Sequence, residues 1–388
     1  MQTVKTEVRC PVHTSFAVEQ IAGMFDVPLS SRATRTFTLE IPDIEPEWQI
    51  GLIVGPSGSG KSTIARHLFG DRMYSMPSWP DDCAVIDGAT CPSAPRETDR
   101  IELPVKTVTK LFTAVGFSSP PSWIKPYAVL SNGERFRCDL VRALIGGISD
   151  SHRCVGSHDI DPHPFGPLDH VVVYDEFTSV VDRDVAKIGS AAIASGIRKQ
   201  QIPCRLVAVT CHYDVAQWLQ PDWTIDMATG EVARRRLRRP AVELEIFRCR
   251  REAWRLFAHH HYLSGSLARY CRCYMATWNG RPVAFCATIS LIGRKNRWRI
   301  SRIVTLPDYQ GIGIGGAVLE AVCRIHQSEG HRINITASHP AVVGHCRNSP
   351  KWRAVGYRKT GSNSGARFVD AYRSSLGRAV ASFEFIGE

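Results

Sequence analysis

The chain lacks any long hydrophobic run and any ordered cysteine pattern. No apolar stretch approaches the roughly 18 residues that a membrane helix needs, and the N-terminus lacks the charged-then-apolar pattern of a signal peptide. The thirteen cysteines are scattered, their nearest pair is Cys271 and Cys273, and no Cys-x-x-Cys occurs. These absences disfavour a disulfide framework or a structural zinc site. They predict a soluble, cytoplasmic protein; at a membrane, another chain would have to supply the span.

Acidic residues are scarce in one stretch. From Val232 to Arg302 there are 17 Lys and Arg against three Glu and no Asp, whereas the whole chain has a net charge of +11. Such a basic region favours a partner that carries phosphate, either DNA or RNA or an anionic cofactor. For the arginine run Arg234–Arg239 alone, a solvated linker is an equally open alternative.

Size and composition are those of a globular protein. A length of 388 residues predicts two domains or three, and a hydrophobic fraction of 44% with a charged fraction of 22% is ordinary.

A phosphate-binding loop is the strongest motif of the chain. The apolar run Ile50–Val54 predicts a strand and Ile64–Phe69 predicts a helix, with Gly-Pro-Ser-Gly-Ser-Gly-Lys-Ser-Thr between them. Glycines let backbone N–H groups face the phosphates of a nucleotide, Lys61 adds a positive charge, and Ser62 offers a hydroxyl to Mg²⁺. The predicted ATP contacts are Gly55, Ser57, Gly58, Gly60, Lys61, Ser62 and Thr63. The alternative is a plain glycine-rich turn.

Two carboxylates follow a second apolar strand, Val171–Tyr174. Asp175 is placed to hold Mg²⁺, and Glu176 is placed to orient or deprotonate the water that attacks the γ-phosphate. A third strand, Leu206–Val209, leads to His212, which can sense the γ-phosphate. Two acids after a strand can also merely begin a turn.

A further anion site is predicted at the start of a helix. Ser131 can cap the helix-like segment Arg135–Leu144, where free N–H groups and the serine hydroxyl would face a phosphate. In this order, the motifs of residues 20–230 resemble the nucleotide-binding domain of the ABC ATPases. The resemblance makes Ser131, Gly133 and Glu134 part of the signature motif, Asp175 the Mg²⁺ ligand, Glu176 the catalytic carboxylate and His212 the switch histidine. It implies a homodimer with two ATP molecules at its interface.

Two departures from the ABC pattern bear on function. No glutamine occurs between Gln49 and Gln200, so the family's glutamine loop has no counterpart, and Asn132 stands where the signature usually has glycine. Both lower the expectation of a transporter subunit and favour a soluble switch. The polar loop from Gly146 to His170 could bind metal through histidines, cysteine and aspartates, but its spacing fits no standard site and favours a solvent loop.

A second glycine-rich turn opens a second helix, Ala317–His326. Gln310-x-x-Gly313-x-Gly315 offers N–H groups to a pyrophosphate. A dinucleotide-binding motif would need an acidic residue about 20 positions further on, and Glu329 lies in that range, so this alternative stays open. The segment Arg302–Gly315 resembles motif A of the GNAT acyltransferases. The resemblance implies that the strand backbone holds the pantetheine arm of acetyl-CoA or another acyl-CoA and that the turn cradles its pyrophosphate. The implied contacts are Ile303, Val304, Gln310, Gly311, Gly313, Gly315 and Gly316.

Two further features of this second module bear on its chemistry. Members of the GNAT family often have a tyrosine that protonates the departing thiolate, five positions before an aromatic residue of the next strand. Five positions before Tyr357, this sequence has Trp352 instead, which we expect at the end of the preceding helix. The segment Phe247–His261 is expected to be a helix, and its three terminal histidines could supply a general base or a metal ligand, or simply lie on the surface or in the core. The run His259–Gly265 is also loosely similar to the adenine-modifying Mom proteins of phages, which makes a nucleic-acid base a candidate acceptor.

The sequence therefore predicts an α/β P-loop ATPase domain of ABC type over residues 1–232, a basic linker over 233–244 and an α+β GNAT-like domain over 245–388. The expected function is ATP binding and hydrolysis coupled to acyl transfer onto a nucleic acid or another large substrate. The alternatives are an ATP-dependent DNA-binding clamp with an inactive GNAT-like domain, and a transporter's ATPase subunit.

Overall fold

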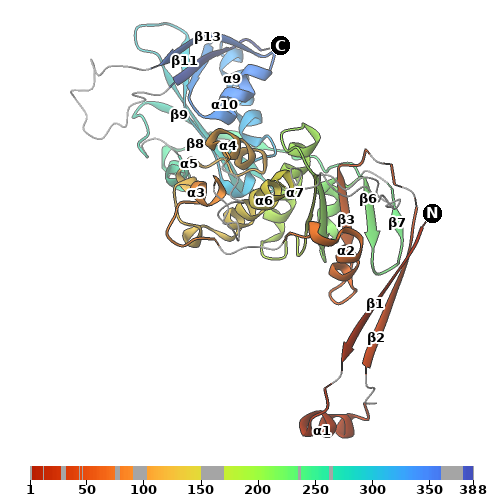
Figure 1. Ribbon diagram of the computed structural model, residues 1–388. Helices are drawn as coiled ribbons and strands as arrows, with labels where there is room; N and C mark the ends of the chain where they lie inside the picture. Colours follow the sequence, from red (N-terminus) through yellow and green to blue (C-terminus); the bar gives the residue numbers. More distant parts are fainter. Residues whose placement is uncertain are drawn as a thin grey trace. The chain divides into compact units, whose positions relative to one another are not determined.

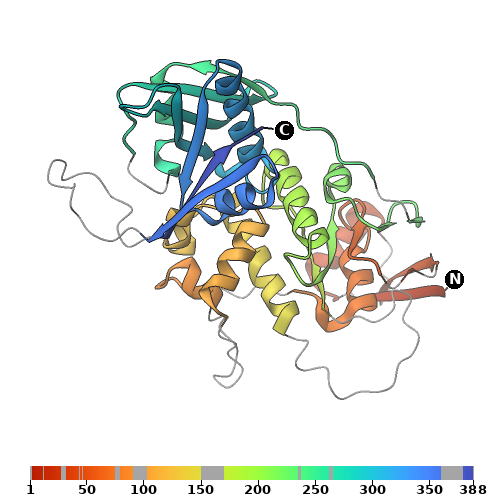
Figure 2. The same cartoon turned by 90° about the horizontal axis from the view of Figure 1, so that it is seen from above.

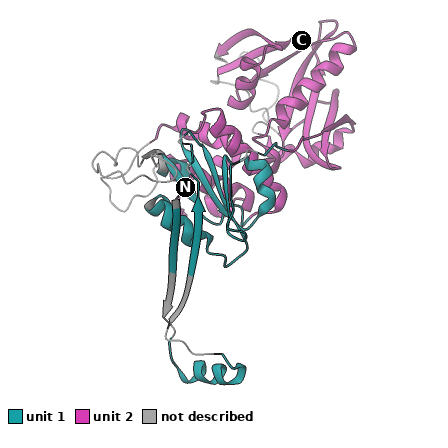
Figure 3. Cartoon of the chain, turned by 90° about the vertical axis from the view of Figure 1, so that its right-hand side faces the viewer, with its two compact units in different colours: residues 1–76, 143–180, 203–239 teal, residues 77–142, 181–202, 240–388 magenta. Residues whose placement is uncertain are grey.

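The chain folds into two compact units. Unit 1 comprises residues 1–76, 143–180 and 203–239, and unit 2 comprises residues 77–142, 181–202 and 240–388 (Figure 3). The computed structural model describes residues 2–11, 13–27, 32–42, 44–45, 47–74, 79–90, 103–149, 170–234, 237–261, 265–359 and 379–387. No helix in these ranges is long and apolar enough to cross a membrane.

Unit 1 is built on a five-stranded sheet in the order β4-β5-β3-β6-β7. The strands are β3 (Ile50–Val54), β4 (Val171–Tyr174), β5 (Arg205–Thr210), β6 (Trp223–Asp226) and β7 (Val232–Ala233). All pairs are parallel except β6 with β7. The central strand β3 and the edge strand β4 are both buried along their whole length, as continuous apolar runs in a parallel sheet covered on both faces must be.

Short helices and a long hairpin complete unit 1. They are α2 (Lys61–Phe69), α8 (Ala216–Leu219) and the 3₁₀ turns η1 (Gly70–Arg72) and η5 (Tyr213–Val215). The hairpin pairs β1 (Gln2–Pro11) with β2 (Arg32–Ile41), and α1 (Phe16–Phe25) lies beyond its far end (Figure 1). The core gathers around the fully buried Trp223, which stacks on Phe69.

Unit 2 contains a seven-stranded sheet in the order β13-β14-β12-β11-β10-β9-β8. The strands are β8 (Glu245–Cys249), β9 (Cys271–Trp278), β10 (Arg281–Ser290), β11 (Arg297–Thr305), β12 (Arg332–Ala337), β13 (Trp352–Lys359) and β14 (Ala379–Phe385). Only β11 and β12 run parallel to each other. Helix α9 (Ile314–Ser328) packs on β10, β11 and β12, and α10 (Pro340–Asn348) packs on β13 (Figure 2).

Successive side chains of a strand point to opposite faces of the sheet, so the buried residues of this sheet form two clusters, one on each face. Ala284 and Cys286 of β10 face the cluster that includes α9, whereas Phe285 faces a smaller cluster with Trp254 and Phe257. The 3₁₀ segments η6 (Arg251–Leu256) and η7 (Ala258–His260) carry that smaller cluster, and η8 (Pro307–Tyr309) links β11 to the turn before α9.

The remaining helices of unit 2 precede the sheet in the sequence. They are α3 (Val85–Thr90), α4 (Val105–Ala114), α5 (Pro120–Trp123), η3 (Tyr127–Val129), α6 (Asn132–Ser149) and α7 (Arg183–Arg198). The residues of α6 up to Arg142 belong to unit 2 and the rest to unit 1. The helical segments 77–142 and 181–202 thus group with the C-terminal part of the chain.

Several predicted elements are confirmed and two are wrong. The strands around the phosphate loop and helices α2 and α9 lie where the patterns predicted them. The predicted helix Phe247–His261 is wrong, because its first residues pair with β9 as β8 and the rest forms 3₁₀ turns. Trp352 does not lie in a helix but begins β13, because α10 ends at Asn348. The domain boundaries remain a prediction.

A close glycine contact allows a test of the unit 1 core. A Cβ on Gly51 of β3 would lie 2.0 Å from the ring of Trp223. We expect Gly51→Ala to lower the free energy of unfolding by about 3 kcal/mol, because the core has no room for the methyl group. Gly146→Ala is the control, since nothing lies within 4 Å of a Cβ there, and helix propensity should make it neutral or stabilising by up to about 1 kcal/mol. Denaturant unfolding measures both, and wild-type stability of Gly51→Ala would contradict the packing.

Candidate functional site

Two glycines of the glycine-rich loop of unit 1 have left-handed backbone conformations. This loop runs from the end of β3 to the start of α2, and Gly58 and Gly60 have φ of +75° and +88°, which other residues rarely adopt. A Cβ on Gly60 would also collide with the ring of Phe37, at 2.4 Å. The Lys61 ammonium donates a hydrogen bond to the carbonyl of Pro56 at 2.8 Å, so its charge lies over the loop.

The predicted Mg²⁺ ligands meet at the carboxyl edge of the unit 1 sheet, where the parallel strands β3 and β4 end on either side of β5. Ser62 Oγ, in the first turn of α2, donates to Asp175 Oδ1 after β4 at 3.1 Å. This edge of an open parallel sheet is where such folds place ligands. One hydroxyl and one carboxylate are hard oxygen donors suited to Mg²⁺ beside a nucleotide phosphate.

The two predicted catalytic residues are linked through one turn of unit 1. Glu176 has φ +51° and accepts a hydrogen bond from Ser179 Oγ at 2.6 Å. In the same turn Thr178 has φ +69°, and its hydroxyl lies 3.2 Å from His212 Nδ1 at the end of β5. Left-handed conformations at residues other than glycine are uncommon and often occur at functional sites.

The predicted signature motif in unit 2 forms a reciprocal helix cap. The N–H of Ser131 donates to Glu134 Oε2 at 3.0 Å, and the N–H of Glu134 donates to Ser131 Oγ at 3.3 Å. Glu134 also accepts from Ser122 Oγ at 2.7 Å. These bonds explain why α6 begins here, and both side chains already have protein partners.

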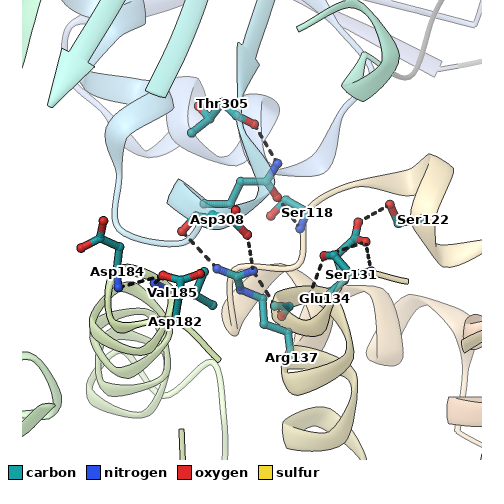
Figure 4. Close-up of polar contacts among 12 residues, drawn as sticks. Ser118, Ser122, Ser131, Glu134, Arg137, Asp182, Asp184, Val185, Thr305 and Asp308 are labelled. Carbon is teal, nitrogen blue, oxygen red and sulfur yellow. Dashed lines mark hydrogen bonds and ion pairs between the residues drawn. The ribbon is translucent and has the colours of Figure 1, made fainter. Parts of the chain in front are cut away.

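A buried arginine links the start of α6 to the turn after β11 (Figure 4). The side chain of Arg137 is fully buried and donates to the carbonyl of Asp308 at 3.2 Å and to that of Gly133 at 3.4 Å. The Asp308 carboxylate lies 4.0 Å from the guanidinium and 3.0 Å from where a Cβ of Gly133 would be. Burial lowers the pKa of Arg137, and burial likewise raises the pKa of Asp308 despite the nearby positive charge.

The first two residues of the predicted pyrophosphate cradle contact the same helical part of unit 2. Gln310 donates to the carbonyl of Thr305 at 3.0 Å and accepts from the N–H of Ser118 at 2.8 Å. Gly311 has φ +90°, and a Cβ there would lie 2.7 Å from Cα of Gly116. The side chain of Gln310 is therefore engaged by the protein itself.

The later glycines of the turn are arranged differently. Gly313, with φ +93°, caps α9 and has nothing within 4 Å of a Cβ position. A Cβ on Gly315 would lie 3.0 Å from Thr305 Oγ1, and one on Gly316 would collide with the ring of His345 at 2.6 Å. The open side of the turn is therefore at Gly313, at the N-terminus of a 15-residue helix, which favours an anion.

Strand β11 separates from its parallel neighbour beside this turn. Its pairing with β12 covers Arg297–Ile300, whereas Ile303 and Val304 pair only with β10 among the described residues. Their second backbone edge is therefore not used by a strand of the described sheet.

His261, the last of the three consecutive histidines, packs on Trp254, whose cluster lies on the face of the unit 2 sheet opposite α9. His261 is buried against Trp254, and burial, followed by Arg302 and His339, lowers its pKa to about 4. His339 caps α10, and its Nε2 lies 3.0 Å from the carbonyl of Ser118. Burial lowers its pKa as well.

Sequence reasoning missed the residues that join segments far apart in the chain. Ser118, Arg137 and His339 belong to no predicted motif, and Asp308 had no predicted role within the segment Arg302–Gly315, so only their contacts reveal a role. The predicted metal candidates of the loop after Gly146, namely His152, Cys154, His158, Asp159, Asp161 and His163, lie outside the described residues.

Comparison with known proteins identifies one part of the chain. Residues 227–343 match the acetyltransferase (GNAT) family. The C-terminal part therefore has a GNAT-like fold, and the match supports acetyltransferase activity for it. No curated protein matches the chain.

Solved structures similar to the chain cover little more than a third of it. The ribosomal-protein-S18-alanine N-acetyltransferase of Escherichia coli is 17% identical, with 38% of this chain and 96% of that chain covered and a TM-score of 0.29. An IAA acetyltransferase of Bacillus cereus is 15% identical, with 37% and 99% covered and a TM-score of 0.30. A GNAT family acetyltransferase of Elizabethkingia anophelis, with acetyl-CoA bound, is 13% identical, with 37% and 97% covered and a TM-score of 0.26.

The buried His261 predicts a pH dependence of stability. Its pKa of about 4 in the folded protein is below the value of about 6.5 expected after unfolding. The unfolded chain therefore takes up a proton first, and stability falls as the pH drops from 6.5 toward 4, by about 1 kcal/mol per pH unit for this residue. We expect His261→Gln to reduce that slope in denaturant titrations, whereas exposed His13→Gln should keep it. Equal slopes in all three proteins would contradict the assignment.

Proposed function

We propose that the chain is an acetyl-CoA-dependent acyltransferase governed by ATP binding and hydrolysis in an ABC-type domain. One observation carries the coupling: the turn before α9 is built against the segment that includes the signature motif. Arg137 binds Asp308, Ser118 binds Gln310, and Gly311 lies on Gly116. A nucleotide-driven shift of α6 would therefore act directly on the acyl-CoA turn.

The proposal of ATP hydrolysis rests on the loop and strand ends of unit 1. Lys61 would pair with the phosphates, Ser62 and Asp175 would hold Mg²⁺, and Glu176 would orient the attacking water. Mg²⁺ bound there would neutralise charge on the β- and γ-phosphates. His212, joined to the Glu176 turn through Thr178, is suited to report whether the γ-phosphate is present.

The ATP-sandwiched homodimer also belongs to this proposal. Asn132, the first residue of α6, is exposed, as is Ser131 before it. The N-terminal end of this 18-residue helix carries a partial positive charge, which favours a phosphate offered by a second subunit. Ser131 would contribute its hydroxyl, while the bond from Ser122 would keep Glu134 in place.

Acyl-CoA binding is proposed along β11 and at the open glycine turn. The free backbone edge of Ile303 and Val304 is suited to the amide groups of the pantetheine arm, and the N–H groups around Gly313 are suited to the pyrophosphate. An acceptor nucleophile would attack the thioester carbonyl, and CoA would leave as a thiolate that needs a proton. Trp352 cannot supply it, because its indole is not acidic and its side chain is buried.

A nucleic acid is the acceptor that the surface chemistry favours, with DNA and RNA both open. Arg248, Lys295 and Arg299 are exposed on or between strands of unit 2. Tyr270 is 82% exposed, and the guanidinium of Arg269 lies 5.6 Å from its ring centre. An exposed aromatic ring beside cationic groups is the combination that stacks bases and binds phosphates. A nucleic-acid partner and an acyl-CoA substrate would both be consistent with a cytoplasmic protein.

Lys61 gives the most direct test of the ATPase proposal. We expect Lys61→Ala to lower the rate of ATP hydrolysis by about 100-fold or more, because the phosphates lose a preorganised positive charge. Lys199→Ala, a change of an exposed lysine in unit 2, should hydrolyse ATP at the wild-type rate. Phosphate release measures both. Wild-type turnover of Lys61→Ala, or none in the wild type with Mg²⁺ and nucleic acid present, would reject the proposal.

Gly313 tests the acyl-CoA site separately. Gly313→Ala places a side chain at φ +93° and disturbs the N–H groups of the turn, so acetyl-CoA affinity measured by calorimetry should fall about tenfold. Gly280→Ala is the matched control, because it also has positive φ and open space but lies in the β9–β10 turn.

The acetyl-CoA titration distinguishes an active transferase from a DNA-binding clamp with an inactive GNAT-like domain. Acetyl-CoA binding by the wild type, weakened only by Gly313→Ala, supports the transferase. No acetyl-CoA binding by the wild type would favour the clamp with an inactive GNAT-like domain, and the ATPase result would then stand alone.

A further inference from the structure

Three side chains with metal-binding chemistry meet at the end of α9 in unit 2. His326 lies in the last turn of the helix, Glu329 is its C-cap, and His331 immediately precedes β12. One possible ligand atom from each residue lies within 4.8 Å of the other two, the only such group of three in the described part of the chain. Closing these atoms around a metal ion requires shifts on the order of 1 Å.

The buried histidine of this cluster has an unused ring nitrogen. His326 is fully buried, and its Nδ1 has no hydrogen-bond partner among the described residues. Its Nε2 lies 3.0 Å from Oγ1 of the buried Thr288 and 3.4 Å from the hydroxyl of Tyr274. A proton on Nε2, donated to Thr288, leaves the Nδ1 lone pair free. This is the arrangement in which metal-binding histidines are usually held.

The other two groups complete a chelating turn that is open on one side. His331 Nδ1 likewise has no described partner, and its Nε2 lies 3.4 Å from Glu329 Oε2. The side chain of Glu329 is 37% exposed and that of His331 is 19% exposed, so an ion can enter from solvent. Gly330, with φ +79°, allows the tight turn between them.

The charges around the cluster are mixed. Arg272 pairs with Glu329 Oε2 and lies 4.2 Å from the ring centre of Trp298, so its charge is partly neutralised, and this ion pair uses one of the two carboxylate oxygens. The partial negative charge at the C-terminus of α9 favours a cation at this end.

We propose that His326, Glu329 and His331 form a binding site for one zinc-class divalent metal ion, which joins the end of α9 to the start of β12. Two imidazoles and one carboxylate are a zinc donor set that leaves a fourth position for water. The scattered cysteines gave no sign of this site, because it uses none of them.

The site is separate from the proposed acyl-CoA turn. Gly313 caps the opposite end of α9, which at 1.5 Å per residue places the two ends about 20 Å apart. The ion is therefore expected to stabilise the fold rather than to contact acyl-CoA, and the inference does not depend on the proposed function.

Zinc binding to the full chain tests the site. Metal-free protein titrated with Zn²⁺ in a calorimeter should bind one equivalent that His331→Ala and Glu329→Gln lose, with affinity falling about 100-fold or more for the histidine. Thr288→Val keeps the shape but removes the hydroxyl partner of His326, and should weaken this equivalent about 10-fold to 100-fold. Saturating Zn²⁺ should raise Tm by about 5 °C in the wild type and not in His331→Ala.

A matched control and clear outcomes make the test decisive. His345→Ala removes a histidine whose Nε2 lies 3.2 Å from Glu320 Oε1 but which belongs to no described group of three, so it should keep wild-type Zn²⁺ binding. Circular dichroism of the metal-free variants checks folding, and Glu329→Gln serves if a histidine variant misfolds. The proposal is overturned if the wild type binds no Zn²⁺, or if these variants retain the same number of equivalents at the same affinity.

Discussion

The guanidinium of Arg137 is a positive charge that unit 2 buries completely, and the arrangement around it depends on its partners. Burying an ion costs several kcal/mol unless other groups replace its water. Here the replacements are the carbonyls of Gly133 and Asp308, with the Asp308 carboxylate 4.0 Å away. Asp308 belongs to the turn after β11. If that turn moved away from the start of α6, the buried guanidinium of Arg137 would therefore lose its partners.

This constraint divides the proposed acyl-CoA turn into two halves with different surroundings. Gln310 and Gly311 are fixed on Ser118 and Gly116, whereas Gly313 faces open space at the start of α9. The fixed half would transmit a movement of the helical segment, and the open half would meet the pyrophosphate. The proposed zinc site lies at the far end of the same helix, so α9 would be held at both ends.

The sequence predicted what depends on local spacing and missed what depends on contacts across the chain. The phosphate loop and the turn at Gly313 follow from glycines placed between a strand and a helix, and both lie where predicted. The helix expected over Phe247–His261 was wrong because pairing with β9 overrode local propensity. No pattern could pair Ser118 with Gln310, 192 positions away, or show that Trp352 begins a strand.

If nucleotide binding controls acyl-CoA binding, the two affinities must be coupled, and a titration of acetyl-CoA measures this coupling. Acetyl-CoA affinity is measured for Glu176→Gln, in which hydrolysis is blocked, with and without saturating ATP and Mg²⁺. We expect ATP to change the dissociation constant about fivefold or more, and Lys61→Ala to abolish the change. If both ligands bind and the acetyl-CoA affinity is the same with and without ATP, the two sites are independent and the proposed coupling is wrong.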